Sequence, residues 1–128
     1  MTNPVRYIEL KTGYSGNGPA WIARVSFSKS GRTIYFNDRA LHRIARGGIS
    51  ANFMDIESRE EFWISAVKRR GTNRHLSNNA PILIERSARD LLEKDPHYKQ
   101  LNFHSFETIE DFPMNSPERF HQIENLRL

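Results

Sequence analysis

The sequence concentrates positive charge in the stretch "KRRGTNRH" at residues 68–75. Guanidinium groups bind phosphate oxygens in pairs, and a lysine adds a compact point charge. Gly71 would let backbone amides approach an anion, and Asn73 could bond to a sugar or base edge. The stretch therefore predicts a loop that binds RNA or another phosphate-rich partner. Its candidate contact residues are Lys68, Arg69, Arg70, Arg74 and His75.

Two neighbouring features could assist such a loop. Arg43 and Arg46 flank a pair of glycines and could join the same basic face. Phe62 and Trp63 precede the loop and could stack on bases, although one of the two must point into the core because strand side chains alternate. The alternative is that residues 68–75 are an ordinary solvated connection in a basic protein.

Catalysis would need a different use of the same residues. A carboxylate, a histidine and a cation can cleave a phosphodiester without a metal. Glu60 or Glu61 could join His75 and Arg74 in such a set only if the fold brought the two ends of one strand together. Because "SREE" is more simply a charged hairpin turn, a metal-independent ribonuclease is the least favoured hypothesis. We expect a binding protein that is not an enzyme.

Patterns that hold metals or nucleotide cofactors are missing. The chain has no cysteine, and its histidines at positions 42, 75, 97, 104 and 121 show no metal-ligand spacing. "TGYSGNGPAW" (12–21) is rich in glycine, but it lacks the Gly-Lys-Ser/Thr or strand–turn–helix context of a phosphate loop. We interpret it as a hairpin loop with Tyr14 at its tip, and we expect no metal and no cofactor.

The composition fits one folded domain. The chain has 128 residues, of which 38% are hydrophobic and 11% aromatic, too many for a disordered chain. No apolar run approaches the roughly 20 residues of a membrane-spanning helix. The opening "MTNPVRYIEL" lacks the pattern of a secretory signal. We therefore expect a cytoplasmic protein without membrane contact.

The charge is unevenly distributed along the chain. The net charge is +4, but residues 1–78 hold 13 Lys/Arg against six Asp/Glu, a net +7. Residues 79–128 hold six against nine, a net −3. The basic body favours a polyanionic partner. The acidic, aromatic C-terminal third either folds back to offset that charge or binds a protein partner, as in a regulatory or immunity-type interaction module.

A period of two dominates the first two thirds of the chain. In "AWIARVSFS" (20–28), apolar Trp21, Ala23, Val25 and Phe27 alternate with a mixed face, which predicts a half-buried strand with Trp21 buried. Residues 38–46 fit either a helix or a strand, and we favour the strand because it continues the antiparallel run. Further strands are predicted at 6–10, 32–36, 52–56, 62–67 and 82–85.

The pattern changes after residue 86. Ser87 is a good N-cap for a helix over "ARDLLEK", and Pro117 starts a second amphipathic helix. The aromatic residues between them indicate a segment that wraps over a surface. We predict a mainly β protein with an SH3-like or other five-to-seven-stranded antiparallel barrel over 1–86. An oligonucleotide-binding-type barrel is the second choice, and residues 87–128 form a helical or irregular extension packed on the barrel within a single domain.

The segments "GNGPAWIARVSFSKSGRTIYF" and "GGISANFMDIESREEFWISAVKRRGTNRH" resemble a group of short bacterial proteins of unassigned function. The resemblance covers about residues 13–77. Some of these proteins carry a deoxyxylulose-phosphate synthase label, which this sequence does not support. The chain is too short for a thiamine-diphosphate enzyme and lacks the Gly-Asp-Gly and Asn segment that would hold the diphosphate. The resemblance therefore implies no activity and no site residues.

Overall fold

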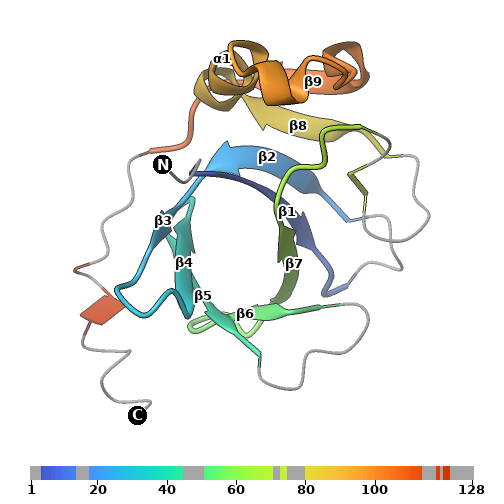
Figure 1. Ribbon diagram of the computed structural model, residues 1–128. Coiled ribbons are helices and arrows are strands. Elements are labelled where there is room, and N and C mark those ends of the chain that lie inside the picture. The colour runs from blue at the N-terminus through green and yellow to red at the C-terminus, as the bar shows by residue number, and fades with distance from the viewer. Residues whose placement is uncertain are drawn as a thin grey trace.

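The computed structural model describes residues 4–13, 18–44, 51–70, 73–74, 80–113, 118 and 120–121. Within them the protein is mainly β, as predicted, and its strands form one mixed sheet that curls into a half-barrel (Figure 1). The order across the sheet is β3-β4-β5-β6-β7-β1-β2-β8-β9. The strands are β1 (Val5–Leu10), β2 (Ala20–Arg24), β3 (Ser26–Phe27), β4 (Thr33–Phe36), β5 (Arg39–Arg43), β6 (Phe53–Asp55), β7 (Glu61–Ser65), β8 (Ile82–Glu85) and β9 (Phe106–Ile109).

The sheet curls because the continuous segment 20–27, which contains β2 and β3, pairs with one strand at its start and with another at its end. β2 is antiparallel to β1, whereas β3 is antiparallel to β4. Only Val25 separates β2 from β3, and its N–H donates to the Pro4 carbonyl at 2.8 Å. The strands β1 to β7 are joined by antiparallel pairs and follow one another around the ring seen in Figure 1.

Both faces of the sheet are covered at β2, so the prediction of a half-buried strand is wrong. Ile22 and Ala23 point to opposite faces, and each is 0% exposed. Ala23 belongs to an inner cluster with aromatic residues of the neighbouring strands, Phe36, Phe53 and Phe62. Ile22 belongs to an outer cluster with residues of β8 and the helix, Ile84, Ala88 and Leu92. Ile22 on the mixed face is buried because later segments of the chain, β8 and the helix, lie over it.

The apolar face predicted for 20–28 is correct only at its centre. Ala23 and Val25 are buried in the inner cluster. Trp21 is only partly buried, and its ring packs on Phe36 with the centroids 5.4 Å apart. Phe27 is 41% exposed under the Arg6 guanidinium, because β3 ends there and leaves the core.

Residues 39–43 form a strand, as favoured over the helix, and a two-residue turn precedes it. Asn37 and Asp38 have positive φ values of 49° and 59°, and Phe36 pairs with Arg39 across the turn. Asn and Asp tolerate positive φ better than most residues, so this dipeptide suits a tight hairpin. Residues 45–50, which include the paired glycines, lie outside the described part of the chain.

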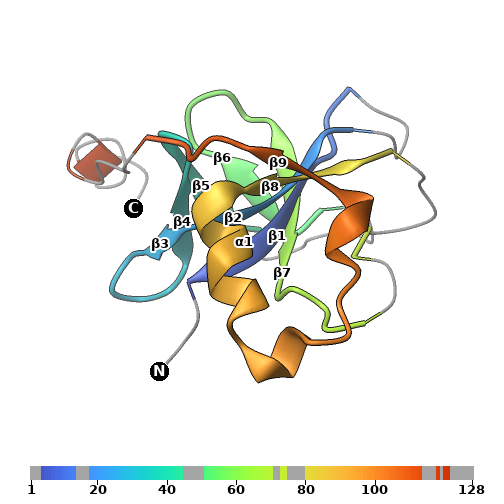
Figure 2. The same ribbon diagram turned by 90° about the horizontal axis from the view of Figure 1, so that it is seen from above.

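The end of the sheet departs from the predicted antiparallel pattern. β8 lies parallel to β2, and β9 lies parallel to β8. The helix α1 (Arg86–Glu93) lies between β8 and β9 in the chain and packs beside β2 and β8 (Figure 2). No strand was predicted at 106–109, because the residues Phe-Glu-Thr-Ile do not alternate in polarity. In the structure these residues are partly buried or exposed.

α1 begins at Arg86, and Ser87 is not its N-cap as predicted. Glu85 occupies that position, but its side chain makes no capping bond. Instead, Asp111 accepts the Ser87 N–H at 2.9 Å and also bonds the Ser87 hydroxyl. Glu85, 2% exposed, accepts the N–H groups of Arg24 at 2.8 Å and Phe112 at 2.7 Å. A later segment of the chain therefore fixes the start of the helix.

The C-terminal helix falls mostly outside the described residues. Glu118, Phe120 and His121 have helical conformation. Phe120 is fully buried and stacks on Tyr35 with the ring centroids 5.9 Å apart. Among the described residues, no helix has the length and apolarity needed to cross a bilayer.

The bonds at the start of α1 predict a pH dependence. The hydrogen bonds from Ser87 lower the pKa of Asp111, with Arg24 and Arg86 acting in the same direction against a smaller effect of burial. The unfolded chain therefore takes up this proton at higher pH than the folded one. The stabilisation is complete above the ordinary Asp pKa of about 3.9 and is lost as the pH falls through the lowered value.

We expect the unfolding free energies of wild type and Asp111→Asn, measured with urea, to converge as the pH falls below about 4 and through the lowered pKa of Asp111. The reason is that acid removes the bond that the variant already lacks. Asp90→Asn, an exposed carboxyl change on the same helix, leaves the Asp111 bonds in place and should keep the loss of stability in acid that they cause. Parallel profiles for wild type and Asp111→Asn would show that this carboxylate does not hold the helix in solution.

Candidate functional site

The predicted basic loop follows β7, and a buried asparagine shapes it. The Lys68 N–H donates to Asn73 Oδ1 at 2.6 Å, and Asn73 Nδ2 donates to the Lys68 carbonyl at 3.4 Å. Asn73 is 4% exposed, so its amide closes the loop and does not face a ligand, contrary to the prediction. Lys68, Arg69 and Arg70 are exposed.

Arg69 and Arg70 border a shallow pocket of about 170 Å³. The opposite wall comes from the short 3-10 helix η1 (Pro96–Tyr98) and the two residues directly after it, Lys99 and Gln100. Asp95 fixes this turn, because its carboxylate accepts the His97 N–H at 2.9 Å. The lining residues are Arg69, Arg70, Pro96, His97, Lys99 and Gln100.

The lining of this pocket is basic. Arg69, Arg70 and Lys99 are cations, His97 can become one, and no carboxylate belongs to the lining. None of these four side chains forms an ion pair with the described part of the chain. Their charges therefore remain available to an anion from solution. The pocket offers two guanidinium forks and an ammonium, a donor set suited to phosphate oxygens.

Arg74 does not belong to this exposed group, so the prediction of an exposed loop cation at this position is wrong. It is 4% exposed, and its guanidinium donates to three backbone carbonyls. These are Gly18 at 2.8 Å, Pro81 at 2.9 Å and Ala80 at 3.1 Å. Because its donors are bound inside the fold, Arg74 has a structural role.

A buried carboxylate balances the charge of Arg74. Glu9 on β1 is 0% exposed, and its Oε1 lies 3.8 Å from Arg74 Nη1. The Tyr7 hydroxyl also donates to Glu9, and Lys11 Nζ is 2.6 Å from its second oxygen. Buried charges persist only when they are paired and hydrogen-bonded, a condition that this network meets.

The remaining predicted contact residues are dispersed or undescribed. Arg43 ends β5, and its guanidinium lies 4.9 Å from the centre of the Phe53 ring. It lines a second pocket that shares no residue with the first. Arg46 and His75 lie outside the described residues, as does Tyr14. The structure thus brings Arg69 and Arg70 together at one pocket, and it does not bring Arg43 to that pocket.

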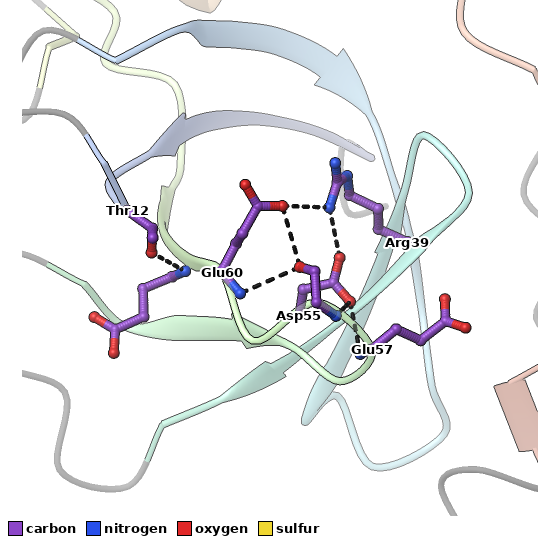
Figure 3. Close-up of polar contacts among 7 residues, drawn as sticks. Thr12, Arg39, Asp55, Glu57 and Glu60 are labelled. Carbon is purple, nitrogen blue, oxygen red and sulfur yellow. Dashed lines mark hydrogen bonds and ion pairs between the residues drawn. The ribbon is translucent and has the colours of Figure 1, made fainter.

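Glu60 lies in a polar cluster at the turn between β6 and β7 (Figure 3). Arg39 donates to Asp55 at 2.7 Å and to Glu60 at 3.0 Å. Burial opposes the charge of Arg39, but the hydrogen bonds and charges of Asp55 and Glu60 outweigh it and raise the pKa of Arg39. Asp55 is 2% exposed and also accepts the Glu57 N–H at 2.8 Å, so this cluster stabilises the turn.

The acid–base set required for a ribonuclease is distributed over separate networks. Glu60 is bound to Arg39, whereas Arg74 is bound to backbone carbonyls. His75 lies outside the described residues. Within the described ranges, no group of three or more His, Asp or Glu residues is placed to hold a metal ion.

The aromatic residues before the loop serve the two cores. Phe62 is 1% exposed in the inner cluster, so it offers no stacking face. Trp63 is partly buried and packs against the outer cluster. The alternation of strand side chains therefore placed one of the two in the interior, as predicted.

His97 and Lys99 were not identified from the sequence. Asp95-Pro96 is a recognisable turn signal, and two basic side chains follow it closely. Nothing local showed that this turn lies beside Arg69 and Arg70, because the two segments are brought together by the sheet and α1.

Comparisons with known proteins add no relative. The chain matches no protein-family model, no curated protein and no solved structure.

The Arg74 network predicts a sharp contrast between two arginines of one loop. Arg74→Met removes the buried donor of three backbone carbonyls and one partner of Glu9, so we expect a loss of about 3–5 kcal/mol in unfolding free energy by urea titration. Arg69→Met should change it by at most about 1 kcal/mol. Equal effects of the two substitutions would contradict the buried assignment.

A double-mutant cycle tests the pairing with Glu9. Glu9→Gln combined with Arg74→Met should cost less than the sum of the two single changes, because neither Glu9 nor Arg74 remains to be left without the other. Strict additivity would show that the two charges do not interact.

Proposed function

We propose that the protein is a non-enzymatic binder of RNA or another phosphate-rich partner, and that the pocket beside η1 receives a phosphate. The observation that carries this proposal is the joint lining of one pocket by Arg69, Arg70, His97 and Lys99, with no carboxylate among the lining residues. Two segments that are distant in sequence contribute cations to the same opening.

The chemistry of the lining suits a phosphate group. Arg69 and Arg70 can each donate two parallel hydrogen bonds to phosphate oxygens. Lys99 adds a charge from the opposite wall. Lys68, at the start of the same loop and exposed, would contact a neighbouring phosphate of a polymer. Single-stranded RNA presents such phosphates in series, so contacts of this kind give affinity without sequence preference.

The rival function, a protein-interaction module using the C-terminal third, receives less support. Its aromatic residues pack within the fold, because Phe103 and Phe106 lie against the outer cluster. Phe112 meets the Phe36 ring edge-on, with the centroids 5.1 Å apart. These side chains are therefore partly used by the protein itself, which leaves less apolar surface for a partner.

Two finer expectations belong to the same proposal. An SH3-like barrel for the strands β1 to β7 is supported by their antiparallel pairing around the curl. A cytoplasmic location is supported by the absence of cysteine and would give access to RNA.

Fluorescence anisotropy with a mixed pool of RNA and DNA oligonucleotides at several salt concentrations tests the proposal. Arg69→Ala/Arg70→Ala should weaken binding to all sequences. It should also reduce the slope of log affinity against log salt by roughly 1.4, since each single-strand phosphate contact contributes about 0.7. Its Tm should change little, because both side chains are exposed.

Lys29→Ala/Arg32→Ala is the matched control, since it removes the same charge from the exposed turn between β3 and β4. It should keep the wild-type slope. If the wild type shows no salt-sensitive affinity for either nucleic acid, the phosphate proposal fails and the protein-interaction module takes first place.

A further inference from the structure

A second pocket, of about 290 Å³, lies on the outer face of β5 and β6. His42 pairs with Met54 across these strands, so the two side chains share a face. Side chains two positions along each strand point the same way, which adds Ile44 and Ile56. The alternate residues, such as Leu41, belong to the inner cluster. The full lining is His42, Arg43, Ile44, Met54, Ile56 and Arg59.

The pocket combines an apolar floor with a basic rim. Ile44, Met54 and Ile56 supply the floor, and the three other lining residues are basic. No Asp or Glu lines it. Arg43 and Arg59 form no ion pair with the described part of the chain, whereas nearby Arg39 is held by two carboxylates. Small-ligand sites have this character: a mostly apolar lining with a few charged groups that fix orientation.

The backbone of Arg59 gives an independent observation at this pocket. Arg59 has a positive φ of 68° at the end of the turn between β6 and β7. Its N–H donates to the Asp55 carbonyl at 3.0 Å, and the Asp55 N–H donates to the Glu60 carbonyl at 2.8 Å. Glycine or asparagine is the favoured residue at such a hairpin position. An arginine here strains the backbone, and the same residue lines the pocket, as strained residues at ligand sites often do.

We infer that this pocket binds a small organic anion with an apolar body, of the class of aromatic or short acyl carboxylates. The carboxylate would lie at the guanidinium group of Arg59, and the apolar body would cover Met54 and Ile56. Arg43 contributes less, because its guanidinium packs on the ring of Phe53, a residue of the inner cluster. A bare phosphate would leave the apolar floor uncovered, and a neutral apolar molecule would leave the cations unused. The inference is independent of the proposed function, because the two pockets share no residue.

A pair of ligands that differ only in charge tests the inference. We would titrate 2-naphthoate and 2-naphthamide into the whole protein and follow the methyl signals of Met54, Ile44 and Ile56 by NMR. Naphthoate should give saturable shifts confined to these residues and their neighbours. Naphthamide should bind roughly tenfold more weakly or worse, because it forms no charge-assisted bond. Equal binding of the two, or shifts that are scattered and do not saturate, would overturn the inference.

Arg59→Gly separates the charge from the fold. Glycine suits the positive φ, so its Tm should equal or exceed that of the wild type, while naphthoate affinity should fall roughly tenfold. Lys29→Ala, which removes an equal charge from the exposed turn between β3 and β4, should keep wild-type naphthoate affinity. Unchanged naphthoate affinity in Arg59→Gly would remove Arg59 from the site and overturn the inference as stated.

Discussion

A buried guanidinium joins parts of the chain that are far apart in sequence. Arg74 holds the carbonyl of Gly18 just before β2 and those of Ala80 and Pro81 just before β8, while facing Glu9 on β1. β1, β2 and β8 are neighbours in the sheet. Removing these charges from water is costly unless every donor and acceptor finds a partner. The network therefore favours the one arrangement in which both β2 and β8 start beside Arg74.

This anchor also determines which cations remain outside. Asn73 and Arg74 are both buried, and Asn73 closes the loop onto the Lys68 backbone. The intervening side chains of Arg69 and Arg70 are consequently exposed and face η1 across the pocket. The interior charge serves stability and the exterior charges stay exposed at the pocket, although all belong to one short basic stretch.

The acidic C-terminal third is fastened to the basic body by a second buried carboxylate. Glu85, at the junction of β8 and α1, accepts backbone N–H groups from Arg24 and Phe112. Asp111 and Glu110 then pair with Arg24 and Arg86 at 3.2 and 2.9 Å. The C-terminal segment therefore folds back and offsets part of the body's charge, one of the two alternatives that the charge distribution left open. It also brings His97 and Lys99 to the wall of the candidate site.

Local chemistry in the sequence determined the strands near 6–10, 32–36 and 82–85 and the exposed cations at 68–70. Alternation, turn residues and charge act over a few positions, so a single sequence reveals them. The tertiary structure alone decided that Arg74 is interior, that β8 and β9 pair in parallel, and that Asp111 caps α1 from 24 residues away. An arginine has the same donors whether it meets water, phosphate or buried carbonyls. Which of these it meets depends on the groups that the folded chain brings within hydrogen-bonding distance, and those groups lie far along the sequence.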